Sequence, residues 1–110
     1  MERFMFLFRG GLLSESPEEM QNHMQKWFAW VEKLKKEGKY LAGEPLNPGG
    51  RTITGAKKTV TDGPFKEGKD IIGGFFMVTA KSYDEAVAMA KDCPDYNHGG
   101  SVEVREVMKI

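Results

Sequence analysis

Two stretches of the chain are apolar on both faces of a predicted strand. In RFMFLFR, at residues 3–9, three phenylalanines alternate with a methionine and a leucine, so neither face of the strand is polar. Residues 71–79, IIGGFFMVT, repeat this character. Strands of this kind are covered on both sides in folded proteins, so the pattern predicts two strands that need cover on each face.

A long helix is predicted to begin directly after Ser16. Pro17 suits the first helical position, and Glu19 stands three residues after the serine, which completes a capping box. The helix is expected to run for about 20 residues, roughly 30 Å, and to end near Gly38 after a lysine-rich last turn. The apolar residues at helical spacing that would form its buried stripe are Met20, Met24, Trp27, Phe28, Val31 and Leu34.

The same capping pattern returns later in the chain. Ser82 and Glu85 predict a second, shorter helix that ends before Pro94. Shorter strands are predicted at residues 39–46, 51–54, 57–61 and 101–109. The second and third of these are expected to pair as a hairpin, and the last strand is expected to be half exposed.

The order of these elements predicts an α+β fold of the ferredoxin-like, split βαβ kind with an inserted hairpin. Residues 1–110 would form a single domain in which two helices cover one face of an antiparallel sheet. Two helices cannot cover both faces, although the strands at 3–9 and 71–79 are apolar on both. We therefore expect a homodimer in which a second copy covers the open face, sheet against sheet.

Composition excludes several classes of protein. The 16 basic and 16 acidic residues cancel, so the chain lacks the positive charge that nucleic-acid binding requires. A single cysteine rules out an internal disulfide and fits a reducing compartment. No apolar run approaches the roughly 20 residues of a membrane-spanning helix. We expect a cytoplasmic protein with neither a nucleic acid nor a membrane as its partner.

Four segments, TDGPFKEGKD, IGGFF, SYDEAVAMAKDCP and GGSVEVR, follow one another along the chain. Together they resemble the DGPF-domain proteins of the YCII-related family. The resemblance implies a ferredoxin-like domain that associates as a dimeric α+β barrel, in a superfamily that includes lactone isomerases and cofactor-poor monooxygenases. It implies no settled activity. A His–Asp pair is the expected active site in the YCII branch, and the resemblance transfers it to His23 and Asp62.

Asp62 stands in an unusual turn. An aspartate in a turn commonly accepts a hydrogen bond from the N–H two residues on, but that residue is Pro64, which has none. The proline also pushes Gly63 toward extended or glycine-only conformations. The carboxylate therefore needs another partner, such as a later N–H, a basic side chain like Lys69, or a ligand. Whether it holds the loop or does chemistry stays open.

His23 lies on the first predicted helix, on the flank of the apolar stripe and beside Trp30. A half-buried imidazole in this position could act as an acid or a base. It could equally be a boundary histidine that bonds a backbone carbonyl or water.

The candidate ligand-binding residues are one arginine and three aromatic residues. Arg9 could meet an anionic ligand or pair with Glu44. Trp27, Trp30 and Phe65 either line a pocket for a small planar ligand or belong to the core. No metal and no cofactor is predicted, because neither histidine nor cysteine occurs at zinc-ligand spacing and the glycine pairs match no nucleotide-binding motif.

Two functions fit these observations. The first is a small-molecule pocket protein that moves a proton on a small carbonyl or lactone-like compound without a cofactor, as an isomerase or lyase would. The second is a non-catalytic dimerisation or regulatory module in which the DGPF turn only shapes a loop. The first hypothesis takes as catalytic residues His23 and Asp62, and as ligand-binding residues Arg9, Trp27, Trp30 and Phe65.

Overall fold

The computed structural model describes residues 1–12, 16–63 and 70–110. The predicted order of elements is confirmed, and most boundaries lie within two residues of the prediction. The last strand is shorter than expected and ends at Glu106. In chain order the elements are β1 (Glu2–Arg9), α1 (Pro17–Lys36), β2 (Tyr40–Pro45), β3 (Arg51–Thr54), β4 (Thr59–Asp62), β5 (Ile72–Ala80), α2 (Tyr83–Ala90), the short 3₁₀ helix η2 (Tyr96–His98) and β6 (Ser101–Glu106).

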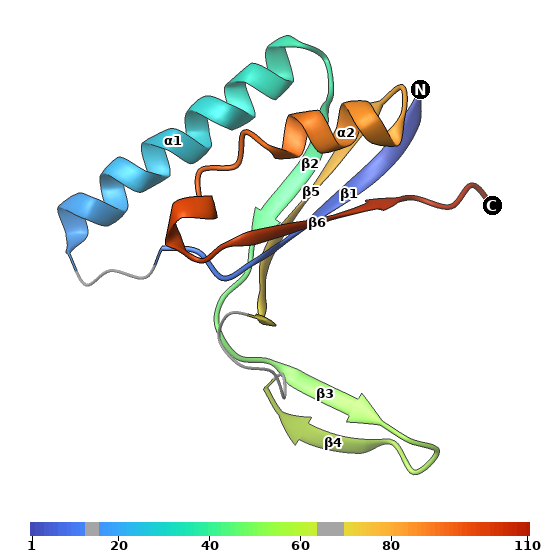
Figure 1. Cartoon of the computed structure of the whole chain (residues 1–110). Coiled ribbons are helices and arrows are strands. Elements are labelled where there is room, and N and C mark those ends of the chain that lie inside the picture. Colours follow the sequence, from blue (N-terminus) through green and yellow to red (C-terminus); the bar gives the residue numbers. More distant parts are fainter. Residues whose placement is uncertain (13–15, 64–69) are drawn as a thin grey trace.

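The main sheet has four antiparallel strands in the order β2-β5-β1-β6, while β3 and β4 form a separate two-stranded sheet. As predicted for an α+β ferredoxin-like fold, both helices lie on one face of the main sheet (Figure 1). The strands β1 and β5 occupy its centre and pair along their full length, from Glu2 opposite Ala80 to Arg9 opposite Ile72. These are the two strands whose faces are both apolar in sequence.

The core lies between β1, β5 and the two helices, and aromatic rings fill much of it. Phe6 stacks on Trp30 with 6.3 Å between ring centroids and 9° between ring planes. Phe8 meets Phe76 edge to face at 4.8 Å. Such offset and T-shaped contacts add stabilisation beyond the burial of area alone.

Both predicted N-cap serines cap their helices, but the buried face of α1 differs from the expected stripe. The hydroxyl of Ser16 accepts a hydrogen bond from the N–H of Glu19 at 3.2 Å. His23 is buried, whereas Met24 and Phe28 are 41% and 55% exposed. Trp30 stacks on Phe6 of β1, so the helix faces the sheet with a different side from the one its apolar stripe predicts. In this orientation His23 lies on the buried side of the helix and not on the flank.

The second face of the main sheet has no layer over it among the described residues. Its centre is apolar and partly exposed, and it consists of Met5, Leu7, Phe75 and Met77. Along the described residues, no helix has both the length and the apolar character needed to cross a membrane.

The β3–β4 hairpin projects from the end of the main sheet, away from both helices (Figure 1). The radius of gyration is 15.5 Å, compared with about 13 Å for a compact chain of this length. Ile53 and Val60 face each other across the hairpin and are 65% and 59% exposed. Asp62, the first residue of the DGPF motif, is the last residue of β4 in this arm.

Candidate functional site

Among the residues that the structure describes, His23 is the one polar or charged side chain that is buried, with 6% of its surface exposed. Its Nε2 atom contacts Oδ1 of Asp95, whose side chain is 15% exposed. The indole N–H of Trp27 points at the same nitrogen from 3.3 Å. When Nε2 carries a proton it donates to Asp95, and when it carries none it accepts from Trp27. Only one of these two hydrogen bonds can therefore form at a time.

Asp95 is held by the turn that follows α2. Its carbonyl oxygen accepts hydrogen bonds from the N–H groups of His98 and Gly100, each at 3.0 Å. The hydroxyl of Tyr96 donates to the carbonyl of Ala90 at 2.7 Å, which ties the turn to the end of the helix. The carboxylate is therefore presented by a closed turn and not by a loose loop.

Two glycine pairs from distant parts of the chain meet at Asp95. A Cβ atom on Gly100 would lie 2.6 Å from the Cβ of Asp95, and one on Gly11 would lie 2.6 Å from its Oδ2. A Cβ atom on Gly10 would lie 2.6 Å from the carbonyl oxygen of Gly99. These distances are too short for real side chains, so glycine is what allows the two loops to approach each other around the carboxylate.

A cavity of about 540 Å³ extends between α1 and the β2 side of the sheet. His23, Trp27 and Asp95 line it together with mostly apolar neighbours. Its size falls within the range typical of small-molecule sites. The charged residues Glu32, Lys35 and Glu44 also line it. The other lining residues are Phe8, Gly10, Leu12, Met20, Met24, Phe28, Val31, Tyr40, Gly43, Pro45, Gly73, Gly74 and Phe76.

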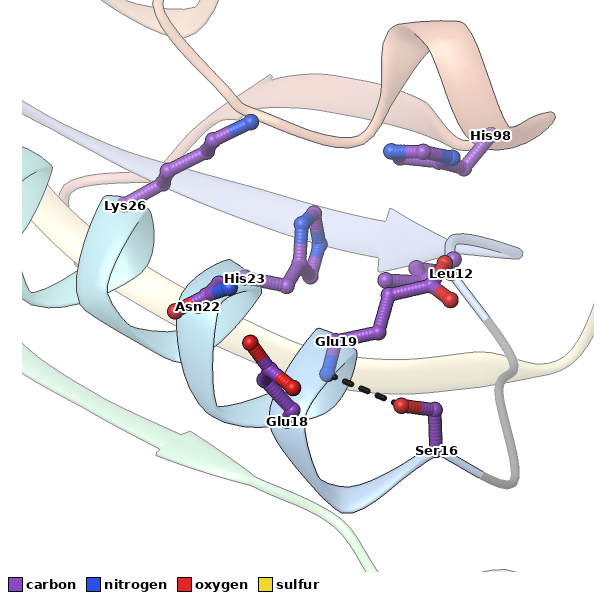
Figure 2. A pocket seen from close by; sticks show the side chains of 8 residues that line it. All are labelled: Leu12, Ser16, Glu18, Glu19, Asn22, His23, Lys26 and His98. Carbon is purple, nitrogen blue, oxygen red and sulfur yellow. Dashed lines mark hydrogen bonds between the residues drawn. The ribbon is translucent and has the colours of Figure 1, made fainter.

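A second cavity of about 360 Å³ lies over the first turns of α1 and is polar (Figure 2). His23 and Leu12 line both cavities. The imidazole is thus part of the wall between an apolar space and a polar one. The remaining lining residues of the polar cavity are Ser16, Glu18, Glu19, Asn22, Lys26 and His98.

Tyr40 and Lys35 stand together in the apolar cavity, toward the C-terminal end of α1. Burial raises the pKa of Tyr40, and the negative charge of Glu44 acts in the same direction. The phenol of Tyr40 therefore stays protonated near neutral pH and can donate a hydrogen bond. The ammonium of Lys35 lies 5.7 Å from the centre of the Tyr40 ring.

The structure does not bring His23 and Asp62 together. Asp62 ends β4 in the projecting hairpin, its side chain is 92% exposed, and its Oδ1 lies 3.2 Å from Nε of Arg51. His23 is buried among the helices and pairs with Asp95 instead. Gly63 adopts a φ of +67°, which is the second of the two kinds of conformation, extended or glycine-only, expected before the proline. Pro64, Phe65 and Lys69 lie outside the described residues.

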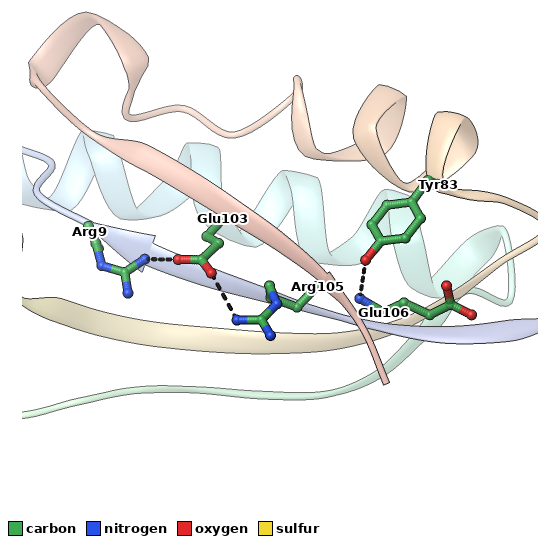
Figure 3. A network of polar contacts seen from close by, with 5 residues as sticks. All are labelled: Arg9, Tyr83, Glu103, Arg105 and Glu106. Atoms are coloured by element: carbon green, nitrogen blue, oxygen red, sulfur yellow. Dashed lines mark hydrogen bonds and ion pairs between the residues drawn. The ribbon is translucent and has the colours of Figure 1, made fainter. Parts of the chain in front are cut away.

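Arg9 lies on the open side of the sheet and does not pair with Glu44 (Figure 3). Its guanidinium donates to Glu103 at 2.7 Å, and Arg105 donates to the second oxygen of the same carboxylate at 3.2 Å. The hydrogen bond from Arg105, followed by that from Arg9, holds the pKa of Glu103 below its usual value. Arg9 thus has a carboxylate partner of its own chain.

The aromatic candidates divide between cavity and core. Trp27 lines the apolar cavity, whereas Trp30 is 4% exposed and belongs to the core. Cys93 is buried as well, and burial raises the pKa of its thiol to about 11. Within the described ranges, no three His, Cys, Asp or Glu side chains gather where they could hold a metal ion.

Asp95 is the site residue that sequence reasoning missed. It stands 72 positions from His23, so no helical or strand spacing relates the two. The available signal was the pairing of glycines, because Gly10–Gly11 follows the first strand and Gly99–Gly100 precedes the last one. Because β1 and β6 are adjacent strands, the loop after β1 and the turn before β6 lie close together. Asp95 lies beside both glycine pairs and is closely surrounded by these two segments.

A profile of the YCII-related domain matches residues 3–110. The chain belongs to the YCII-related family. An uncharacterised protein of Rhizobium meliloti (strain 1021) is 33% identical over 78 residues, which cover 61% of this chain and 63% of that protein. The match to this YCII-related chain thus spans less than two thirds of the relative's length.

Solved structures also include a similar chain. The 5-chloro-2-hydroxyhydroquinone dehydrochlorinase from Burkholderia phenoliruptrix AC1100, in complex with 2,5-dihydroxybenzoquinone, is 20% identical with a TM-score of 0.49. That comparison covers 97% of this chain and 95% of the dehydrochlorinase. The resemblance to the YCII-related family, read from four sequence segments, is confirmed by the match over nearly the whole chain.

Proposed function

We propose that this YCII-related protein is an enzyme that moves a proton on a small carbonyl or lactone-like compound, as an isomerase or lyase does. The observation that carries the proposal is the buried His23–Asp95 pair, which opens onto an apolar cavity of about 540 Å³. A buried acid–base pair beside a cavity of this size is a common arrangement for proton transfer. Asp62, in the hairpin, takes no part in this proposal.

The pair works as one acid–base unit. Asp95 accepts a hydrogen bond from the N–H at Nε2 and so fixes the tautomer, which leaves Nδ1 as the nitrogen that takes a proton from the substrate. The carboxylate then stabilises the imidazolium that forms, because opposite charges in contact are strongly favoured in a buried site. If the proton shifts toward Asp95, the Trp27 N–H can bond the freed Nε2.

Hydrogen–deuterium exchange tests the proposal without knowledge of the full reaction. Small ketones, lactones and keto acids are incubated with the protein in deuterated water, and loss of their acidic C–H signals is followed by proton NMR. We expect the wild type to accelerate exchange for at least one compound, and His23→Gln and Asp95→Asn to lower the rate by about 100-fold or more.

Asp62→Asn serves as the matched control, because it removes an exposed carboxylate from the hairpin and leaves the cavity unchanged. Circular dichroism confirms that each variant is folded. Loss of exchange in Asp62→Asn, or full exchange in Asp95→Asn, would contradict the assignment of the pair.

The open face of the sheet favours a homodimer, which is compatible with either function considered for the chain. Met5, Leu7, Phe75 and Met77 form an apolar surface at the centre of the sheet that no described element covers. A second copy that packs sheet against sheet would bury it and produce a dimeric α+β barrel. If no compound exchanges protons, a non-catalytic dimerisation module becomes the better description.

A further inference from the structure

His23 has access to two different environments. Asp95 and Trp27, which contact its Nε2, line the apolar cavity together with it, and Asn22, Lys26 and His98 line the polar cavity together with it. Figure 2 shows the imidazole between the first turns of α1 and the ring of His98. A group in this position can receive a proton from one space and release it into the other.

Exchange of the substrate's proton with solvent requires such a release. The ring of His23 is only 6% exposed, so bulk water has little direct contact with it. A proton taken from the substrate either returns to the same carbon or is exchanged with solvent through an intermediate group. The polar cavity has room for water, since about 360 Å³ corresponds to roughly ten molecules at about 30 Å³ each.

His98 lies between His23 and the solvent. The two ring centroids are 5.2 Å apart and the ring planes are perpendicular. At this separation the two rings meet edge to face and leave no space for water between them, so a bridging water molecule would lie beside them in the polar cavity that both rings line. The side chain of His98 is itself exposed. Imidazole is the side chain best suited to exchange protons near neutral pH.

The backbone fixes His98 relative to the catalytic pair. Its N–H donates to the carbonyl of Asp95 at 3.0 Å, and Gly99 closes the turn with a φ of +76°. Both Asp95 and His98 are therefore presented by one short turn toward the same histidine of α1. The other charged groups that line this cavity are Glu18, Glu19 and Lys26.

We infer that His98 is a proton-relay residue that connects His23 with bulk water. The inference rests on the proposed function. In the forward direction, a proton leaves the substrate carbon, resides on the His23 imidazole, passes through a bridging water to His98, and enters the solvent. A solvent proton follows the reverse route to reprotonate the carbon, so protons and charge balance over one cycle.

Buffer rescue tests the relay in the exchange assay described above. At low buffer concentration, we expect His98→Ala to lower the deuterium exchange rate by about tenfold, because the proton returns to its carbon before it can be replaced. His98→Gln, which keeps a polar side chain but cannot titrate, should behave in the same way. Added imidazole buffer should restore most of the rate in both variants. Asn97→Ala, on the same turn, should match the wild type.

Each outcome decides the inference. A rate that falls in both variants and recovers with imidazole supports a relay, since a merely structural role would not respond to buffer. Unchanged rates in His98→Ala, or a loss that imidazole cannot restore, would overturn the relay while leaving the His23–Asp95 assignment intact. Absence of exchange in the wild type would instead contradict the proposed function, and the relay with it.

Discussion

A buried imidazole needs a polar partner, and two side chains compete for one nitrogen of His23. Asp95 and the Trp27 N–H both meet Nε2. The histidine and the tryptophan are recognisable in sequence, because four residues separate them on one helix. The carboxylate is not, because only tertiary structure joins the turn after α2 to α1. The DGPF aspartate had the stronger sequence signal, yet it lies exposed beside Arg51.

Cys93 is expected to be unreactive in the folded protein. Its side chain is 7% exposed, and burial raises the pKa of its thiol to about 11. A folded-state pKa above the ordinary value means that the thiolate, the reactive form, is scarce until the pH approaches 11. At about pH 8 we expect a thiol reagent to label the native protein at least 100-fold more slowly than the unfolded protein. Rapid stoichiometric labelling of native protein would show that this packing is incorrect.

At the level of elements, helix starts were easier to predict than helix orientation. Capping boxes are local, and both Ser16 and Ser82 accept the expected hydrogen bond. The buried face of α1 depends instead on which side chain fits the neighbouring strand. Trp30 stacks on Phe6, whereas Met24 and Phe28 stay 41% and 55% exposed. Spacing along one helix carries no information about the shape of the surface it packs against.

The turn that presents Asp95 should tolerate no side chain at Gly100. The added methyl group of Gly100→Ala would lie 2.6 Å from the Cβ of Asp95 and 2.8 Å from its carbonyl oxygen. We expect a loss of stability of about 1–3 kcal/mol in urea unfolding, because overpacking forces the backbone to move. Proton exchange should fall as well, since the carboxylate moves with the turn.

Gly73→Ala is the control for this substitution. The Cβ atom would meet only the carbonyl oxygen of Phe8, at 4.0 Å, so we expect a change within about 0.5 kcal/mol. Equal stability of the two variants would mean that the approach of the glycine pairs is not a constraint on the fold.

For the molecule as a whole, the order of elements was predictable and the site was not. Alternation and capping operate over a few residues, and together they indicate the split βαβ arrangement. The site combines α1, the loop after β1 and the turn before β6, which only the completed sheet brings together. Its cavity lies on the helix-covered side, whereas the expected dimer interface lies on the opposite face, so the two can be altered independently.

Leu7→Glu should separate the two copies of the proposed dimer. The side chain of Leu7 lies at the centre of the open face, opposite Phe75 in the strand register. In a symmetric interface the substitution acts twice and places two like charges in an apolar contact, so we expect the dissociation constant to rise at least 100-fold. Sedimentation at several concentrations measures the change.

The matched control is Val87→Glu, which adds the same charge to an exposed position of α2 in the helical layer. It should leave the association unchanged. If wild type and Leu7→Glu both sediment as monomers at high concentration, the open face is not a dimer interface. The apolar character of both faces of β1 would then require a different partner, because an uncovered apolar sheet centre is unfavourable in water.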